Sequence, residues 1–146
     1  MRKQAYTMIA LLVLVGSMAV AAQAQDSGRN ELRANIPFEF SVGDKTMPAG
    51  QYTISQVNPS SDRAVLQLRS KDGRNAVMIQ MNNVIGKAGG GARLVFNRYG
   101  SESYFAEAWN SSEANGLKAR RSKAERAARQ ELAGLKPTFV TVALSR

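Results

Sequence analysis

Residues 66–81 have the sequence LQLRSKDGRNAVMIQM, and this stretch decides the fold that we expect for the chain. On both sides of the central KDGR, apolar and polar side chains alternate, a period of two that is typical of strands with one buried face. Asp72-Gly73 lies between the two runs and favours a type I′ turn, because both residues tolerate positive φ. The stretch therefore predicts two antiparallel strands joined by a tight turn.

The same alternation recurs before and after this hairpin, and it predicts about seven strands in all. The other expected strands lie at residues 36–42, 52–55, 93–97, 104–109 and 138–144. Pro37 removes a backbone donor from the first of them, which favours an edge position. The chain is therefore expected to be mainly β, either an antiparallel β-sandwich or a small barrel.

One segment near the C-terminus departs from the strand pattern. Residues 122–133 are rich in helix formers, and Ser122 with Glu125 matches the capping box that begins many helices. Glu125 and Arg129 have the spacing of an ion pair on one helix face. The helix has a narrow apolar stripe that we expect to lie against the sheet: Ala124, Ala128, Leu132 and Leu135. We predict one C-terminal helix before the last strand, preceded by a polar loop at 110–116.

The first 24 residues have the form of a secretory signal peptide. Arg2 and Lys3 precede an apolar run, and Ala22-Gln23-Ala24 is a small-x-small cleavage site. An uncleaved anchor helix is the alternative, because the run is near the shortest length that spans a membrane. With cleavage, we expect general secretory export to the periplasm or the extracellular space, without a remaining transmembrane span. A flexible leader at 25–31 and one β-rich domain at 32–146 would then form the mature protein.

Composition excludes several classes of chemistry. The 146 residues include neither cysteine nor histidine, which removes disulfides, thiolate nucleophiles, Ser-His-Asp triads and the commonest metal ligands. We therefore expect no metal, no cofactor and no enzymatic activity. The enzymatic alternative is a hydrolase that uses carboxylates alone, and its candidate residues are Glu102, Glu107 and Glu113. We do not favour this alternative.

Positive charge is concentrated near the predicted helix. The chain has 20 basic and 11 acidic residues, and removal of the two basic residues in the signal lowers the formal charge from +9 to +7. The helix region holds the candidate anion-binding residues, which are Lys118, Arg120, Arg121, Lys123, Arg126 and Arg129. Their expected partners are an anionic envelope polymer or lipid head groups, and the alternative is a solvated face that only confers solubility. Nucleic acid is not expected, because no aromatic residues interleave with these cations.

The predicted strand at 104–109 raises a second possibility. Strict alternation places Phe105, Glu107 and Trp109 on the same face. If this face points outward, Phe105 and Trp109 form an aromatic strip for carbohydrate or a partner. If it points inward, both rings belong to the core, and Glu107 needs a buried partner.

Five short motifs in a fixed order carry a resemblance. They are N-I-P-F-E-F-S-V-G at 35–43, M-P-A-G-Q-Y at 47–52, F-N-R-Y-G at 96–100, Tyr104-Phe105 with Trp109, and Ser122 with Glu125. In this order the chain resembles small exported proteins of unknown function that are abundant in acidobacterial genomes. The resemblance covers nearly all of the mature chain. It implies an exported β-domain without an assigned activity, and it supplies no catalytic residues.

These observations predict an exported, non-enzymatic β-domain with a binding or structural role in the cell envelope. The alternative is a lipocalin-like carrier of a small ligand. A carrier would require an apolar interior cavity of several hundred cubic ångströms, roughly the size of known ligand pockets.

Overall fold

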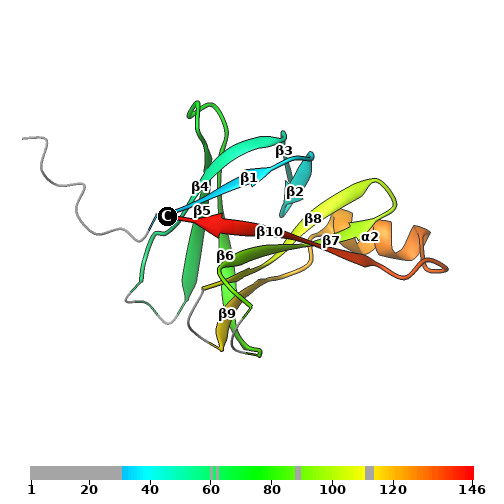
Figure 1. Cartoon of the computed structure of the whole chain (residues 1–146). Coiled ribbons are helices and arrows are strands. Elements are labelled where there is room, and N and C mark those ends of the chain that lie inside the picture. Colours follow the sequence, from blue (N-terminus) through cyan, green and yellow to red (C-terminus); the bar gives the residue numbers. More distant parts are fainter. Residues whose placement is uncertain (1–30, 60, 62, 88–89, 111–113) are drawn as a thin grey trace, which may run out of the picture.

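A computed structural model describes residues 31–146 of the protein, except 60, 62, 88–89 and 111–113 (Figure 1). The predicted signal peptide and all of the predicted leader but Glu31 lie outside the described residues. The described strands and helix are β1 Leu32–Ile36, β2 Phe40–Val42, β3 Lys45–Met47, β4 Gly50–Gln56, β5 Ala64–Ser70, β6 Ala76–Ile85, β7 Arg93–Tyr99, β8 Glu102–Trp109, β9 Asn115–Ala119, α2 Lys123–Glu131 and β10 Thr138–Ser145.

Eight of these strands close into an antiparallel barrel. Their order is β8-β7-β10-β1-β4-β5-β6-β9, and β9 pairs back onto β8 to complete the ring. The hairpin β2–β3 is not one of the strands of the ring, and it is attached to the ring where β2 pairs in parallel with β8. The mainly β class, the helix and the strand after it are confirmed, and of the two expected architectures the protein adopts the barrel.

The described residues form more strands than the sequence pattern predicts. The expected strand at 36–42 is divided, because β1 ends at Ile36 and β2 begins only at Phe40. The short strands β3 and β9 have three and five residues, too few for a clear alternation. β9 begins at Asn115, inside the segment predicted to be a polar loop.

The β5–β6 hairpin is confirmed, but its turn is not type I′. Only Gly73 has a positive φ, of 72°, whereas a type I′ turn requires positive φ at Asp72 as well. The Asp72 carboxylate instead accepts hydrogen bonds from the Ser70 hydroxyl and from the Arg74 backbone N–H. This local side-chain bonding favours a wider loop, which is closed where the Ser70 N–H donates to the Asn75 carbonyl.

Aromatic rings fill the space inside the barrel. Phe40 contacts Tyr52 of β4 and Phe96 of β7 edge to face, with ring centroids 5.3 Å apart in both pairs. Phe96 also contacts Phe105 of β8. Because these rings come from strands on different sides of the barrel and from the β2–β3 hairpin, they connect its walls through one apolar core.

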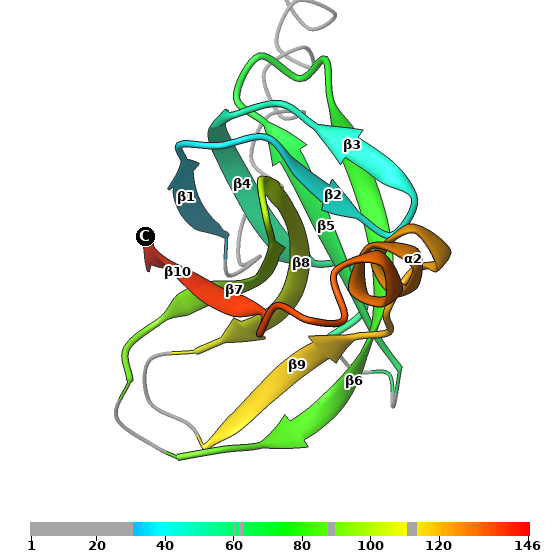
Figure 2. The ribbon, with the colours of Figure 1, turned by 90° about the vertical axis from the view of Figure 1, so that its right-hand side faces the viewer.

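Helix α2 lies outside the barrel wall (Figure 2). Ala128 and the partly buried Leu132 pack against Tyr99 and Tyr104, on the outer face of β7 and β8. Only half of the predicted apolar stripe makes this contact, because Ala124 and Leu135 are exposed. Among the described residues, no helix is long and apolar enough to cross a membrane.

Candidate functional site

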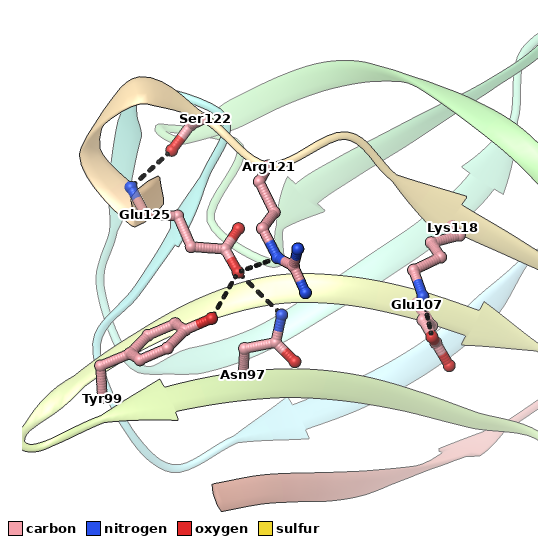
Figure 3. A network of polar contacts seen from close by, with 7 residues as sticks. All are labelled: Asn97, Tyr99, Glu107, Lys118, Arg121, Ser122 and Glu125. Carbon is pink, nitrogen blue, oxygen red and sulfur yellow. Dashed lines mark hydrogen bonds and ion pairs between the residues drawn. The ribbon is translucent and has the colours of Figure 1, made fainter. Parts of the chain in front are cut away.

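Glu125 attaches α2 to the barrel (Figure 3). Its side chain faces the outer surface of β7, and the residue is only 3% exposed. One carboxylate oxygen, Oε1, accepts hydrogen bonds from Asn97 Nδ2 at 2.7 Å and from the Tyr99 hydroxyl at 3.3 Å. The Arg121 Nε atom lies 3.7 Å from the same oxygen. This buried carboxylate is therefore balanced by a cation and two neutral donors, as burial of charge requires.

The capping box is confirmed in one of its two bonds. The Ser122 hydroxyl accepts a hydrogen bond from the Glu125 backbone N–H at 3.1 Å, as expected at a helix N-terminus. The Glu125 side chain points to the barrel instead of forming the ion pair predicted with Arg129. Arg121 takes that place, one turn before Glu125.

The two tyrosines beneath the helix have altered acidity. Burial raises the pKa of Tyr99, and the nearby Glu125 carboxylate raises it further. For Tyr104, burial and then the hydrogen bond to Glu102 raise the pKa to about 12. Both phenols therefore stay protonated at neutral pH, when Tyr99 donates to Glu125 and Tyr104 donates to Glu102.

A second ion pair lies beside the first. Lys118 of β9 and Glu107 of β8 are cross-strand neighbours, and Nζ of the lysine is 3.3 Å from Oε1 of the glutamate. The other carboxylate oxygen of Glu107 accepts a hydrogen bond from the Trp109 indole N–H at 2.9 Å. Glu107 therefore has defined partners at both oxygens, and one of them is Lys118.

A cavity of about 370 Å³, here called the helix-side pocket, lies between these two ion pairs. Its lining residues are Asn97, Ala106, Glu107, Lys118, Ala119, Arg121, Glu125 and Phe139. Phe139 is the large apolar residue of this lining, and it is 70% exposed. The pocket thus places an accessible aromatic ring beside two cations and two carboxylates.

Sequence reasoning missed Phe139, although the pattern of its strand contains the signal. Val140, Val142 and Leu144 face the core, so alternation places Phe139 on the outer face of β10. Asn97 is its cross-strand neighbour on β7. A large aromatic residue on the polar face of a strand is the feature that would have identified it.

The predicted anion-binding residues divide into two groups. Lys118 and Arg121 line the helix-side pocket and are paired with glutamates. The others are exposed, and none has a carboxylate within 4 Å among the residues that the structure describes; we call them the basic flank, and they are Arg120, Lys123, Arg126 and Arg129. The last three are spaced three apart on α2 and therefore share one side of the helix.

The structure does not bring Phe105 and Trp109 together as an exposed strip. Phe96 pairs with Phe105 but Val95 pairs with Glu107, so Ala106 is an extra residue that forms a β-bulge and reverses the alternation. Phe105 therefore lies in the core and is 3% exposed.

Trp109 follows the bulge on the outer face, but its ring is covered. The residue is 7% exposed, and the Arg93 guanidinium carbon lies 5.1 Å from the ring centroid. The ring lies so close to Gly86 and Gly116 that a Cβ atom at either position would be within 2.5 Å of it. Trp109 thus packs on the barrel wall and is not available as a platform for a ligand.

Comparison of the chain with protein-family models, with curated proteins and with solved structures gives no significant match. Within the described part of the chain, no three acidic side chains gather in an arrangement that could hold a metal ion.

Proposed function

We propose that this protein is an exported, non-enzymatic binding domain that recognises an acidic polysaccharide of the cell envelope in the helix-side pocket. The observation that carries the proposal is the position of the exposed Phe139 ring beside Lys118 and Arg121 in one cavity. The export step rests on the signal-like sequence of residues 1–24.

Each wall of the pocket suits one part of an acidic sugar. The apolar face of a sugar ring packs on an aromatic side chain such as Phe139, and its carboxylate is attracted to Lys118 and Arg121. Both cations keep donors for a ligand, since Lys118 has three N–H groups and Arg121 has five, and both side chains are about half exposed. Their glutamate partners orient both cations before a ligand arrives.

The basic flank adds long-range attraction. Its four cations have no described carboxylate partner, so their field extends into solvent and draws a polyanion towards the pocket. This contribution weakens with salt, because the screening length falls to about 8 Å at physiological ionic strength.

Two other roles receive less support from the geometry. A lipid-inserting helix needs an unoccupied apolar face, but Ala128 and Leu132 of α2 pack against the barrel. A lipocalin-like carrier is compatible with a barrel, but the interior here holds the contacting rings of Phe40, Tyr52 and Phe96. The surface pocket is therefore the better candidate for a ligand.

Calorimetric titration with hexagalacturonate, a short acidic oligosaccharide, tests the proposal. We expect saturable binding that the Phe139→Ala and Lys118→Gln variants each weaken about tenfold, and no binding of neutral cellohexaose. Met78→Ala is the matched control, since Met78 is also an exposed apolar residue but lies outside the pocket.

Two results would contradict this function. One is equal binding by the Phe139→Ala and Met78→Ala variants, which would exclude the pocket. The other is binding to vesicles of phosphatidylglycerol without binding to hexagalacturonate, which would identify lipid head groups as the partner.

A further inference from the structure

A larger cavity, of about 700 Å³, lies on the outer face of β1, β4 and β5. We call it the arginine pocket, and it shares no lining residue with the helix-side pocket. In the ring of eight strands β4 is four positions from β8, so the two pockets lie on opposite walls of the barrel. The arginine pocket is therefore a separate feature of the surface.

Cross-strand register arranges polar residues over this face in rows. The central row is Arg33, Thr53 and Arg69, from β1, β4 and β5. Asn35 pairs with Gln51 on one side of this row, and Ser55 pairs with Gln67 on the other. The residues that alternate with these rows, such as Ala34, Tyr52 and Leu68, are buried in the core, so the rows themselves face outward.

The two arginines are suited to hold a negatively charged ligand together. They lie two strand spacings apart, so their Cα atoms are separated by roughly 9.6 Å. Both long side chains can therefore reach the same ligand group between them. Neither has an ion pair among the described residues, although both line the cavity. The guanidinium group is a planar fork of donors that matches carboxylate or phosphate oxygens.

The β5–β6 hairpin forms a defined wall of this pocket. Lys71, Asp72 and Gly73 belong to the lining, and the Lys71 N–H donates to the Gln51 carbonyl at 2.9 Å. The Asp72 carboxylate accepts hydrogen bonds from Ser70 and from the Arg74 N–H and keeps its negative charge. With Glu31 it sets two carboxylates against the three cations of the lining, Arg33, Arg69 and Lys71, which leaves a formal charge of +1. A Cβ at Gly73 would be 3.5 Å from an Arg69 guanidinium nitrogen, which places that group beside the turn.

The other polar residues of the lining indicate which chemical groups a ligand would carry beside its anionic group. Asn35, Gln51, Thr53 and Gln67 offer amides and a hydroxyl, which donate to and accept from sugar hydroxyls. Tyr52 also lines the pocket, but its hydroxyl donates to the Pro48 carbonyl and its ring belongs to the core. Polar bonding rather than ring stacking is therefore the mode of recognition available here.

We propose that the arginine pocket is a second binding site, in which Arg33 and Arg69 hold the carboxylate or phosphate group of an acidic oligosaccharide. The amide and hydroxyl rows contact the sugar hydroxyls on both sides of that group. This site is independent of Phe139 and of the function proposed for the helix-side pocket.

Titration monitored by backbone amide NMR shifts tests the second site. The probes are hexagalacturonate, an oligomannose phosphate, inorganic phosphate and neutral cellohexaose. We expect one acidic oligosaccharide to shift amides of β1, β4 and β5 saturably, with affinity reduced at least about tenfold in the Arg33→Gln/Arg69→Gln double variant. The matched control is Arg63→Gln, which removes an exposed charge that lies outside the pocket lining and has no ion pair among the described residues.

Each outcome decides the proposal. Binding of hexagalacturonate alone identifies a carboxylate ligand, and binding of the oligomannose phosphate alone identifies a phosphate ligand. The shifts in β1, β4 and β5 should persist in a Phe139→Ala background, so failure of one pocket is distinguishable from failure of the other. Three results would each overturn the proposal. They are binding of inorganic phosphate alone, equal affinities of the double variant and of Arg63→Gln, and the absence of a saturable shift.

Discussion

Glu125 shows how one residue joins sequence, packing and site. Its sequence context predicts a helix-capping role, which the Ser122 bond confirms, and a surface ion pair with Arg129, which the structure replaces. The difference arises because α2 is rotated to place Glu125, rather than Ala124, against the barrel. That rotation depends on partners from β7, 26 and 28 residues away in the chain, so local spacing does not determine it.

Replacement of Glu125 should destabilise the protein. The Glu125→Ala variant leaves the amide of Asn97 and the hydroxyl of Tyr99 without their acceptor, at a cost of about 1–3 kcal/mol. Urea denaturation measures the change in the free energy of unfolding. Gln130→Ala is the control, because Gln130 is exposed on the same helix and its loss should change stability by at most about 0.5 kcal/mol. Equal stabilities of the two variants would show that the Glu125 contacts do not stabilise the fold.

Gly116 should not tolerate a side chain. A Cβ at this position would lie 2.5 Å from the Trp109 ring, so Gly116→Ala must displace the indole or the strand, at a cost of about 1–3 kcal/mol. We expect a lower denaturation midpoint and a red-shifted emission of Trp109, the only tryptophan in the chain. Gly134→Ala is the control, because a Cβ there would meet no atom within 4 Å. Unchanged emission in Gly116→Ala would contradict the close packing of the Trp109 ring on Gly116.

At the scale of elements, local patterns predict what local interactions control. The hairpin around Asp72-Gly73, the helix start at Ser122 and the inward phase of β10 all follow from signals within a few residues. The β-bulge at Ala106 does not, because it is defined by the register between β8 and β7. Because of this one extra residue, Phe105 faces the core, whereas Glu107 and Trp109 lie on the outer face. Strict alternation places all three on one face, so it could not show whether Phe105 and Trp109 form an exposed strip.

The first turn of α2 depends on its cap. Ser122→Ala removes the acceptor of the Glu125 backbone N–H and should destabilise the protein by about 0.5–2 kcal/mol, because that donor is then unsatisfied. Thermal unfolding followed by circular dichroism measures the effect. Ser122→Asp should restore most of the stability, since aspartate is also a good N-cap, and Ser101→Ala in the exposed β7–β8 turn should have little effect. Equal melting temperatures for Ser122→Ala and Ser101→Ala would refute a stabilising cap.

At the scale of the whole molecule, ring closure distinguishes the barrel from the sandwich. It requires the pairings of β1 with β10 and of β8 with β9. The first joins the two ends of the described chain, and the second involves a five-residue strand without a clear sequence signal. Alternation predicts strands but not their partners, so the sequence was compatible with both architectures. In the closed ring the interior is filled by side chains, and both candidate pockets lie on outer walls.

The buried tyrosines predict how the stability of the whole protein changes at high pH. The pKa of Tyr104 is raised to about 12, and burial raises the pKa values of Tyr52 and Tyr99 as well. A tyrosine in the unfolded chain has a pKa of about 10. Between these values the folded state retains protons that the unfolded state loses. The stabilisation is therefore complete below about pH 10 and is lost as the pH rises towards 12.

Urea denaturation at a series of pH values from 8 to 12 measures this dependence. The midpoint should fall steeply above about pH 10 in the native sequence and less steeply in Tyr104→Phe, because that variant lacks the phenol whose pKa is raised to about 12. All other side chains are the same in the two proteins, so their contributions cancel in the comparison of slopes. Parallel slopes would mean that the Tyr104 phenol ionises equally readily in the folded and unfolded states. That result would be incompatible with a hydroxyl buried beneath α2 and bonded to Glu102.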